Sequence, residues 1–353
     1  MKIAVTSDVH LKSRQESPQR YNALENIFEK ITHKGILELI IAGDLFEKDY
    51  DNYSDFDTLC KKYPNVTVNI IPGNHDSQIE KRFFSAENII VVTEPQIKEI
   101  DKVPFLFLPY DSAKSMDEVI VDFAHRHTLP SKWILIGHGD YLTSNREVNP
   151  YEPHLYMPLT VKMINNYNPS VVILGHIHKP SQFGKVFYPG SPCGLNINET
   201  GKRKFLILEV HSLTPQYQTV ETDVLYFSET IQMFPVDDEV SFLKNRLSDI
   251  IQKWQLKEEE LKKVKVRLFL KGYTKDKNVI TQNLVQIVRN KGIKFYDSLG
   301  PDTSELKTLK ETDREKISLL NRVKIKIGEI DKGQFISSID DVMNKVMELI
   351  LGS

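Results

Sequence analysis

Short apolar runs recur along the first part of the chain, and five of them end in the same way. Each is rich in β-branched residues, stops at Gly or Ser, and is followed by His, Asp or Asn. The five stretches are IAVTSDVH from Ile3, LIIAGD from Leu39, IIPGNHD from Ile70, ILIGH from Ile134 and VVILGHIH from Val171. Such runs, bounded by turn residues, predict buried strands. We therefore expect strand ends that present polar side chains at one place.

Apolar residues recur at helical spacing between these runs. After Pro18 they predict a helix that ends near Gly35, and similar patterns predict helices over residues 55–62, 115–127 and 161–167. Further strands are expected over residues 89–92, 97–100, 105–108, 183–192 and 204–210. Alternating strands and helices predict an α/β fold for a first domain of residues 1–233.

The pattern changes after residue 233. A helix starting near Pro235 is followed by a strand in which Val264, Val266, Leu268 and Leu270 alternate with Lys263, Lys265, Arg267 and Phe269. That strand would have one buried and one basic face. With a helix over 279–289 and a strand over 293–296, residues 234–300 predict a small α+β domain.

The end of the chain reads as a linker and an amphipathic helix. Residues 301–334 are largely polar and are predicted to be a linker, and residues 335–353 form the helix. Its apolar face would carry Ile336, Ile339, Val342, Val346 and Ile350. Since no further domain remains to bury that face, we expect it to dock on a partner.

Composition indicates the cellular compartment of the protein but says little about its function. Apolar residues make up 40% and charged residues 27% of the chain, with a net charge of −2, which is ordinary for a soluble protein. Cys60 and Cys193 are too few for a disulfide framework or a zinc ribbon. The first residues predict a strand rather than a basic-then-apolar leader, and no apolar run approaches the ~18 residues of a membrane span. We therefore expect a cytoplasmic protein with no membrane partner.

The strand-end side chains have the composition of a metal centre. Five of the ten histidines lie there, together with Asp8, Asp44 and Asn74. A lone histidine is more often a packed residue, but charged groups at converging strand ends need a compensating cation. Mixed nitrogen and oxygen donors suit Mn²⁺, Fe²⁺ or Zn²⁺ better than Mg²⁺ or Ca²⁺. So many ligands require two ions, which in such pairs lie about 3.5–4 Å apart and activate a hydroxide against a phosphoryl group.

These motifs, in this order, resemble those of the calcineurin-like metallophosphoesterases. The resemblance covers roughly the first 210 residues and implies a four-layer α/β/β/α sandwich. It implies a first metal on Asp8, His10 and His178 and a second on Asn74, His138 and His176, bridged by Asp44. It also implies a catalytic His75 beside the scissile phosphate, where it orients the phosphate or protonates the leaving oxygen. Asp76 would hold a ligand or the backbone in place.

Four further details are similar to the SbcD/Mre-eleven nucleases of double-strand-break processing. They are the opening MKIAVTSDVHL, the GDLFE around Asp44, the YPGSP of Tyr188–Pro192, and the small domain that follows. The resemblance implies a DNA-capping domain at 234–300 and a C-terminal segment that binds an SbcC/Rad-type ABC ATPase with a coiled coil. It also implies a Mn²⁺-dependent, homodimeric DNA repair nuclease in the cytoplasm, at the nucleoid or in a phage-infected host.

The small domain carries a basic stretch that fits a DNA partner. Residues 253–294 contain twelve Lys or Arg against four Asp or Glu. Lys263, Lys265 and Arg267 are the candidate phosphate contacts. A merely solvated basic face remains the alternative interpretation.

One residue departs from the family pattern. Many cellular members carry a histidine three residues beyond the bridging aspartate, where this chain has Glu47. A carboxylate there repels a phosphodiester and donates no proton at neutral pH. The balance of exonuclease and endonuclease activity therefore stays open. In its length, its compact cap and this substitution the chain resembles phage-type members of the family.

Two other functions remain alternatives at this point. One is a phosphodiesterase or phosphatase that acts on small nucleotides or phosphoproteins with the same metals. The other is a scaffold for an ATPase partner that has lost catalysis, against which every ligand position is filled.

Overall fold

The chain folds into two units. The computed structural model describes residues 1–49, 52–143 and 154–309, and in the C-terminal part positions 318, 319, 322, 323, 325, 326, 342, 345, 346, 349 and 350. The first unit comprises Met1–Leu195 and Lys202–Val224, and the second comprises Asn196–Gly201 and Leu225–Ser353. Within the described residues, no helix is both long and apolar enough to span a bilayer.

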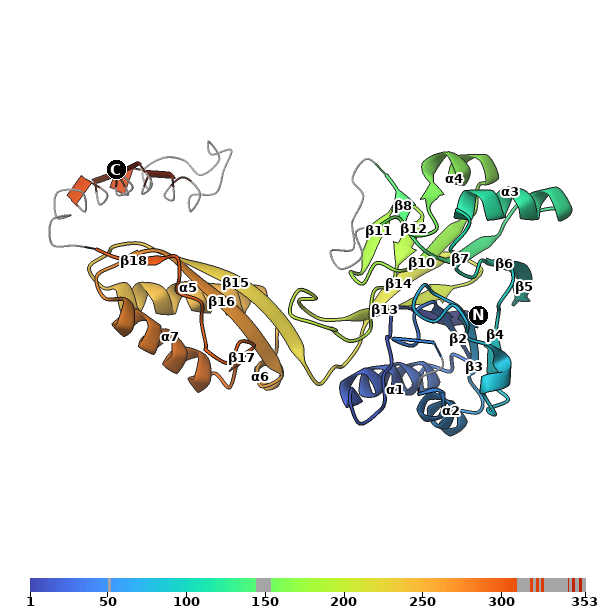
Figure 1. The fold of residues 1–353 in the computed structure, drawn as a ribbon, viewed down its shortest axis with the longest axis horizontal. Helices are drawn as coiled ribbons and strands as arrows, with labels where there is room; N and C mark the ends of the chain where they lie inside the picture. Colours follow the sequence, from blue (N-terminus) through green and yellow to red (C-terminus); the bar gives the residue numbers. More distant parts are fainter. Residues whose placement is uncertain are drawn as a thin grey trace. The chain divides into compact units, whose positions relative to one another are not determined.

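Two six-stranded sheets form the centre of the first unit (Figure 1). The first sheet has the order β14-β13-β1-β2-β3-β4 and the second β11-β12-β10-β7-β6-β5. The strands of the first sheet are β1 (Lys2–Thr6), β2 (Glu38–Ala42), β3 (Thr67–Ile71), β4 (Ile89–Val91), β13 (Lys204–Glu209) and β14 (Thr214–Thr219). Those of the second are β5 (Gln96–Ile100), β6 (Val103–Phe107), β7 (Ile134–His138), β10 (Val171–Gly175), β11 (Ser181–Phe183) and β12 (Val186–Tyr188). A short parallel pair, β8 (Tyr141–Leu142) and β9 (Leu159–Thr160), lies apart from both.

Three apolar layers hold the first unit together. Alternate residues of β2, such as Leu39 and Ile41, pack against α1 (Pro18–His33) and α2 (Tyr53–Lys62). The intervening Ile40 and Ala42 pack against the second sheet. The far face of that sheet is covered by α3 (Met116–Arg126) and α4 (Val161–Tyr167). The predicted α/β/β/α sandwich is confirmed, and it explains why the strands are apolar at every position.

The edges of these sheets show where sequence patterns were insufficient. Residues 183–192 were predicted as one strand, but β11 and β12 form a hairpin around Gly184 and Lys185. Gly184 has φ +60°, the left-handed conformation that such a two-residue turn requires. Strand β14 was not predicted, because its sequence TPQYQT is polar. It is an edge strand, which tolerates both the polarity and the proline.

The second unit is a small sheet covered on one side by helices. Strand β15 (Leu225–Met233) pairs in parallel with β16 (Val264–Thr274), and β16 pairs with β17 (Lys294–Phe295) and β18 (Leu306–Thr308). The helices are α5 (Glu239–Lys253), α6 (Glu258–Leu261) and α7 (Lys277–Asn290). Apolar residues of α5 and α7 pack on the inward side chains of β15 and β16.

Two predicted ranges differ from these elements. The first-domain boundary was placed after Met233, whereas the whole of β15 pairs with β16 in the second unit. The predicted linker of residues 301–334 contains β18, whose Leu306 is buried in the second core. A three-residue strand with one apolar residue carries too little periodicity to be detected.

The C-terminal segment also has neighbours within the second unit. Val342, Val346 and Ile350 pack with a cluster around Phe234. The expectation that no domain remains to contact this face is therefore wrong for these three positions. Ile336 and Ile339 lie outside the described residues, as do residues 144–153 of the loop before β9.

Candidate metal centre

The candidate ligands come from the carboxyl ends of five strands. Strands β1, β2 and β3 run parallel in one sheet, and β7 and β10 run parallel in the other. Parallel strands bring their carboxyl ends to one edge. Two hydrogen bonds join these edges across the sandwich, from the His176 backbone N–H to Oδ1 of Asp8 (2.8 Å) and between Nδ1 of His138 and the Ala42 carbonyl (2.9 Å). The five motifs therefore converge.

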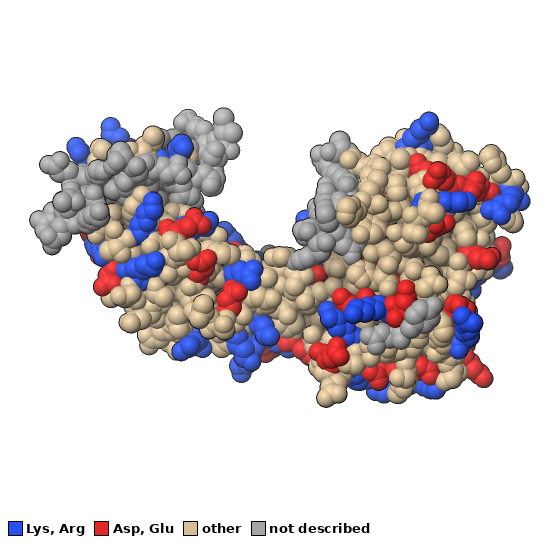
Figure 2. Space-filling view, in the orientation of Figure 1, with Lys and Arg blue, Asp and Glu red and all other residues tan. Residues whose placement is uncertain are grey.

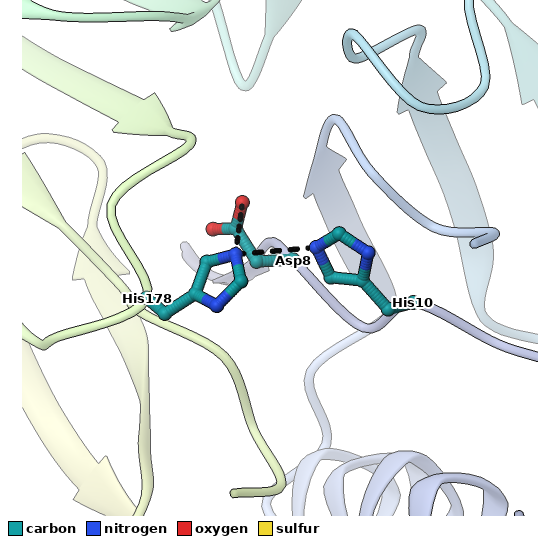
Figure 3. A group of neighbouring side chains, drawn as sticks. All are labelled: Asp8, His10 and His178. Atoms are coloured by element: carbon teal, nitrogen blue, oxygen red, sulfur yellow. Dashed lines mark hydrogen bonds and ion pairs between the residues drawn. The ribbon is translucent and has the colours of Figure 1, made fainter. Parts of the chain in front are cut away.

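Asp8, His10 and His178 form the first group (Figure 3). Nε2 of His178 lies 3.2 Å from Nε2 of His10 and 4.0 Å from Oδ1 of Asp8. Asp8 also accepts a hydrogen bond from the Ser7 hydroxyl. These three donors can bind one cation, and they are the set that the sequence resemblance assigned to the first metal.

Asp44 lies between the other candidate ligands. Its Oδ2 is 3.3 Å from Nε2 of His138 and 3.7 Å from Nε2 of His10. Asp44 belongs to two further groups that could hold a metal, one with His10 and His75 and one with Asp8 and His138. A carboxylate shared between groups has the geometry of a bridging ligand.

Asn74 joins this cluster and His176 lies at its side. Oδ1 of Asn74 is 2.8 Å from Nε2 of His138. The His176 ring centroid is 5.6 Å from that of His138, and Nε2 of His176 is 3.9 Å from Oδ2 of Asp140. Among the described residues His176 falls in none of the three groups. Asp140, which is 1% exposed, was not predicted to act on a ligand.

His75 lies within the cluster rather than outside it. Its backbone N–H donates to Oδ1 of Asp44 (2.9 Å), and its Nδ1 is 3.2 Å from the Glu47 carbonyl. The ring makes an edge contact with that of His10, with 4.7 Å between centroids. By distance alone His75 could bind a metal with His10 and Asp44, or face a ligand bound beside them.

The backbone at these strand ends is unusual. Asp8, His10 and Asp44 all have φ between 51° and 53°, the left-handed region that L-residues rarely occupy. Such conformations persist only where the surroundings enforce them, and they cluster at functional sites. Gly175 is required for a different reason, since a Cβ there would lie 1.9 Å from the Ala42 carbonyl oxygen. The glycine allows the two sheets to approach at the ligands.

Burial and neighbouring charges shift the pKa values in the cluster. Burial lowers the pKa of His10 well below its usual value and raises that of Asp8. Burial also acts to lower the pKa of His138, but the Asp44 carboxylate outweighs it and raises that pKa to about 10. Burial, and then the charge of Asp44, raise the pKa of Asp76 to about 7. Carboxylates and imidazoles compete here for protons in a space without bulk water.

The donor set fits divalent cations. Asp8, Asp44 and His138 are at most 1% exposed, and burying two carboxylates side by side is costly unless a cation compensates them. Imidazole nitrogens with carboxylate and amide oxygens suit transition metals such as Mn²⁺, Fe²⁺ or Zn²⁺. Binding would displace the protons that these pKa values retain.

Asp76 supports the loop that carries Asn74 and His75. Its carboxylate accepts hydrogen bonds from the backbone N–H groups of Gly73 (2.8 Å) and Phe46 (3.1 Å). It thereby ties the end of β3 to the end of β2. The sequence hypothesis had placed Asp76 in a supporting role of this kind.

Two arginines contact the ligand loops and were not predicted from the sequence. Arg20 donates to the His10 carbonyl, and Arg203 donates to the His178 carbonyl. Arg203 also bonds to the backbone and hydroxyl oxygens of Ser191, at 2.9 and 2.7 Å. Neither arginine belongs to a strand-end motif, so sequence patterns gave no signal for them.

The candidate DNA contacts lie in the second unit, on or next to β16. Lys263 and Lys265 are exposed. Arg267 instead forms a two-bond ion pair with Asp297, at 2.9 and 3.0 Å, and its guanidinium lies over the Tyr296 ring. On the face drawn in Figure 2, Lys and Arg are interspersed with Asp and Glu. The basic stretch is thus partly neutralised by its own neighbours.

Comparisons with known proteins identify the first unit. The sequence model for calcineurin-like phosphoesterases matches residues 1–180, a range that contains all five strand-end motifs. No curated protein matches the chain in sequence. Among solved structures, hypothetical protein PH1004 from Pyrococcus horikoshii OT3 is 15% identical, with 73% of this chain and 95% of that chain covered and a TM-score of 0.35. GAP50, the anchor in the inner membrane complex of Plasmodium, is 11% identical, with 63% and 89% covered and a TM-score of 0.40.

Proposed function

The chain belongs to the calcineurin-like phosphoesterase family, and from that premise we propose that it is a DNA nuclease that hydrolyses phosphodiesters with two divalent metal ions. Family membership and the candidate ligand groups make it a metal-dependent hydrolase of phosphoesters. The observation that carries the proposal is the convergence of three ligand groups, in which Asp8, His10 and Asp44 each belong to two. Two adjacent cations are what such shared groups can hold.

Each ligand has a proposed role. Asp8, His10 and His178 would hold one ion, and Asn74, His138 and His176 the other, with Asp44 between them. Bound divalent ions would supply positive charge to the phosphoryl oxygens and lower the pKa of an attacking water. The left-handed backbone at Asp8, His10 and Asp44 fixes the ligands before substrate arrives, so little reorganisation is needed.

His75 is the proposed group that faces the scissile phosphate. Its backbone is fixed by Asp44 and its Nδ1 by the Glu47 carbonyl, so Nε2 is the nitrogen directed away from these contacts. At that atom it can orient a phosphate oxygen or give a proton to the leaving oxygen. Because His75 lies beside His10 and Asp44, this proposed proton donor would be next to the ligand cluster.

DNA as the substrate is supported by the second unit. Lys263 and Lys265 are exposed on or next to a strand that follows the catalytic domain in the chain. Positive side chains of this kind contact phosphates without reading sequence. Since Arg267 is paired with Asp297, we assign the phosphate contacts to the two lysines.

End-labelled linear duplex and circular single-stranded DNA test the proposal with Mn²⁺. We expect cleavage that Asp8→Ala and His75→Ala abolish and that His125→Ala, an exposed histidine of α3, leaves intact. Cutting of the circle indicates endonuclease activity, and loss of label from linear DNA alone indicates exonuclease activity. Hydrolysis of bis(p-nitrophenyl) phosphate without DNA cleavage would instead favour a phosphodiesterase of small substrates. Absence of both activities would favour a scaffold.

The proposed partners are a second copy of the chain and an SbcC/Rad-type ATPase with a coiled coil. Support comes from the resemblance of the N-terminal motifs to SbcD/Mre-eleven proteins, since Val342, Val346 and Ile350 of the C-terminal segment pack within the second unit. A cytoplasmic location is part of the same proposal. Sedimentation equilibrium tests the dimer, and co-purification with a coexpressed ATPase, with and without residues 335–353, tests the partner.

A further inference from the structure

The sheet of the second unit buries only one of its two faces against helices. Val264, Val266, Leu268 and Leu270 of β16 are each at most 1% exposed and pack with α5 and α7. Side chains alternate between the faces of a strand, so the residues between these four point outward. The outward face is a feature of the sheet as a whole, because β15, β17 and β18 pair in register with β16.

The register arranges the outward side chains in rows across the strands. Outward residues of β16 are paired with outward residues of its neighbours. The pairs are Tyr226 with Lys265, Ser228 with Arg267, Thr230 with Phe269, Gln232 with Lys271, Lys265 with Lys294, and Tyr273 with Lys307. In parallel strands, paired residues lie on the same face, so these rows form one surface.

This surface combines aromatic and basic residues and has no acidic residue at an outward strand position of β15 to β18. Its aromatic members, counting Tyr296 just after β17, and its basic members are Tyr226, Phe269, Tyr273, Tyr296, Lys265, Arg267, Lys271, Lys294 and Lys307. Acidic residues border it from the connecting segments, where Asp297 pairs with Arg267, Glu305 pairs with Lys271, and Asp302 lies opposite Phe269 in an isolated β-bridge. A merely solvated face would be expected to mix both charge signs and to lack rings.

Two of the rings are held in place. Tyr226 and Tyr296 meet edge to face, with 5.8 Å between centroids. The Arg267 guanidinium lies 5.0 Å from the Tyr296 centroid and is itself fixed by two hydrogen bonds to Asp297. Tyr296 is nevertheless 39% exposed. The ion pair thus serves to position a ring that a ligand can reach.

The opposite end of the surface has a different neighbour. Tyr273 packs with Phe234 in the cluster that includes Val342, Val346 and Ile350 of the C-terminal segment. We therefore exclude Tyr273 from the site and define the stacking surface as Tyr226, Phe269 and Tyr296 with Lys265 and Lys294.

We propose that the stacking surface binds single-stranded nucleic acid. Bases without a partner strand stack on exposed rings, and neighbouring lysines neutralise the phosphates, which is how open sheets and grooves bind single strands. Duplex DNA keeps its bases stacked on one another and cannot use the rings. The biological use of this surface rests on the proposed nuclease function, since cleavage near an end leaves unpaired strands.

Fluorescence anisotropy of labelled oligo-dT with the full-length chain in EDTA tests this inference. EDTA removes hydrolysis, so the binding result is independent of whether the chain is a nuclease. We expect oligo-dT to bind more tightly than a duplex of equal length. Phe269→Leu and Tyr296→Leu should each weaken binding by about fivefold or more, because they keep apolar bulk but lose the stacking ring.

Three controls separate stacking from folding and from charge. Tyr296→Phe keeps the ring and should bind like the original chain, and Phe83→Leu makes the same exchange in the first unit and should have no effect. Lys265→Ala should weaken binding and reduce its salt dependence, whereas Lys257→Ala at the N-cap of α6 should not. Thermal unfolding of each variant identifies any loss of fold. Parallel titrations with oligo-rU decide whether DNA or RNA is preferred.

Two results would overturn the inference. One is equal affinity of the original chain, Phe269→Leu and Tyr296→Leu for oligo-dT, with all three folded. The other is dissociation of a dimer by Phe269→Leu in light scattering, which would assign the surface to contact between two copies of the chain.

Discussion

Nη1 of Arg20 lies 2.7 Å from Oε2 of Glu47, and the same guanidinium donates to the His10 carbonyl. Oε2 of Glu47 is in turn 3.8 Å from Nδ1 of His10. Nε2 of His10 faces Asp44 and His178. Arg20 and Glu47 therefore lie on the opposite side of the His10 ring from these candidate ligands. Arg20 also offsets the charge of Glu47, so this carboxylate repels a phosphodiester less than its sequence position suggests.

Replacing Arg20 by Met should weaken metal binding. Without the guanidinium, the His10 carbonyl and the Glu47 carboxylate beside the His10 ring lose the donor that they share. Losses of about 10- to 100-fold in metal affinity are typical for such supporting residues. Titration calorimetry with Mn²⁺ and metal-free protein measures this. Arg14→Met, which removes an ion pair with Glu25 at 2.9 Å, is the control. Unchanged affinity in Arg20→Met would mean that Arg20 does not position His10.

Asp44→Asn should remove both metal binding and hydrolysis. Asparagine keeps the oxygen that accepts the His75 backbone N–H at 2.9 Å, so the loop retains its anchor. It loses the charge that both ligand groups share, and a loss of several kcal/mol of transition-state stabilisation corresponds to about a thousandfold in rate. Elemental analysis should find fewer than two Mn²⁺ per chain, and bis(p-nitrophenyl) phosphate hydrolysis should fall accordingly.

Asp122→Asn on α3, where the half-exposed carboxylate pairs with Lys114 at 2.8 Å away from the ligand cluster, is the matched control for Asp44→Asn. In the unsubstituted chain, EDTA should abolish hydrolysis and Mn²⁺ should restore it. Full activity of Asp44→Asn would contradict the assignment of Asp44 as the shared ligand.

Asp57 should make stability depend on pH. Burial acts to raise the pKa of its carboxyl, but Lys61 and the donors of Ala86 and Ser85 outweigh it and lower that pKa to about 2. A carboxyl whose pKa is lowered in the folded state stabilises the fold at every pH above its unfolded-state pKa, which is near 3.8. This contribution disappears as the pH falls through the folded-state pKa of about 2. It amounts to about 2 kcal/mol at pH 7 and about half of that at pH 3.

Urea unfolding of Asp57→Asn against the original chain measures this difference. The gap in unfolding free energy should be constant between pH 5 and pH 7 and should narrow at pH 3. Glu87→Gln, an exposed substitution in a neighbouring loop, should change stability by less than about 0.5 kcal/mol at each pH. A gap that widens on acidification would show that Asp57 is not held by these donors.

The sandwich and the meeting of the five motifs were predictable because each depends on a local pattern. An apolar run such as Leu39–Ala42 indicates burial on both faces, and a following Gly-Asp or Gly-His indicates a strand end with a polar display. The meeting of the motifs then follows from the parallel pairing of the strands, which brings their carboxyl ends to the same edge of each sheet. The sequence did not indicate how closely the sheets approach, which places the Asp44 carboxylate 3.3 Å from His138.

What the sequence did not reveal depends on contacts between distant residues. Arg203 follows Lys202 in a run of basic residues and resembles a surface position, yet it is 3% exposed. Likewise, the basic strand was evident from alternation, but the pairing of Arg267 with Asp297 comes from a loop thirty residues away. Strand β15 does alternate, with Leu225, Phe227, Ile231 and Met233 buried, and could have been predicted.

Arg203→Met should destabilise the first unit and loosen the loop that carries His178. The guanidinium joins the His178 carbonyl to Ser191, and methionine can fill the space but cannot donate a hydrogen bond. Leaving buried acceptors without this donor should cost about 3 kcal/mol in unfolding free energy. Arg203→Lys should recover only part of it, because one ammonium group cannot reproduce the planar fork of donors.

Urea unfolding and Mn²⁺ titration of these variants distinguish a structural effect from a positioning effect. If Arg203 positions His178, Arg203→Lys should bind Mn²⁺ more weakly even where it remains fully folded. Lys162→Met, an exposed change on α4, should alter neither quantity. Wild-type stability in Arg203→Met would show that the two loops hold together without this side chain, through the backbone N–H of Ser191 that also donates to the His178 carbonyl at 3.0 Å.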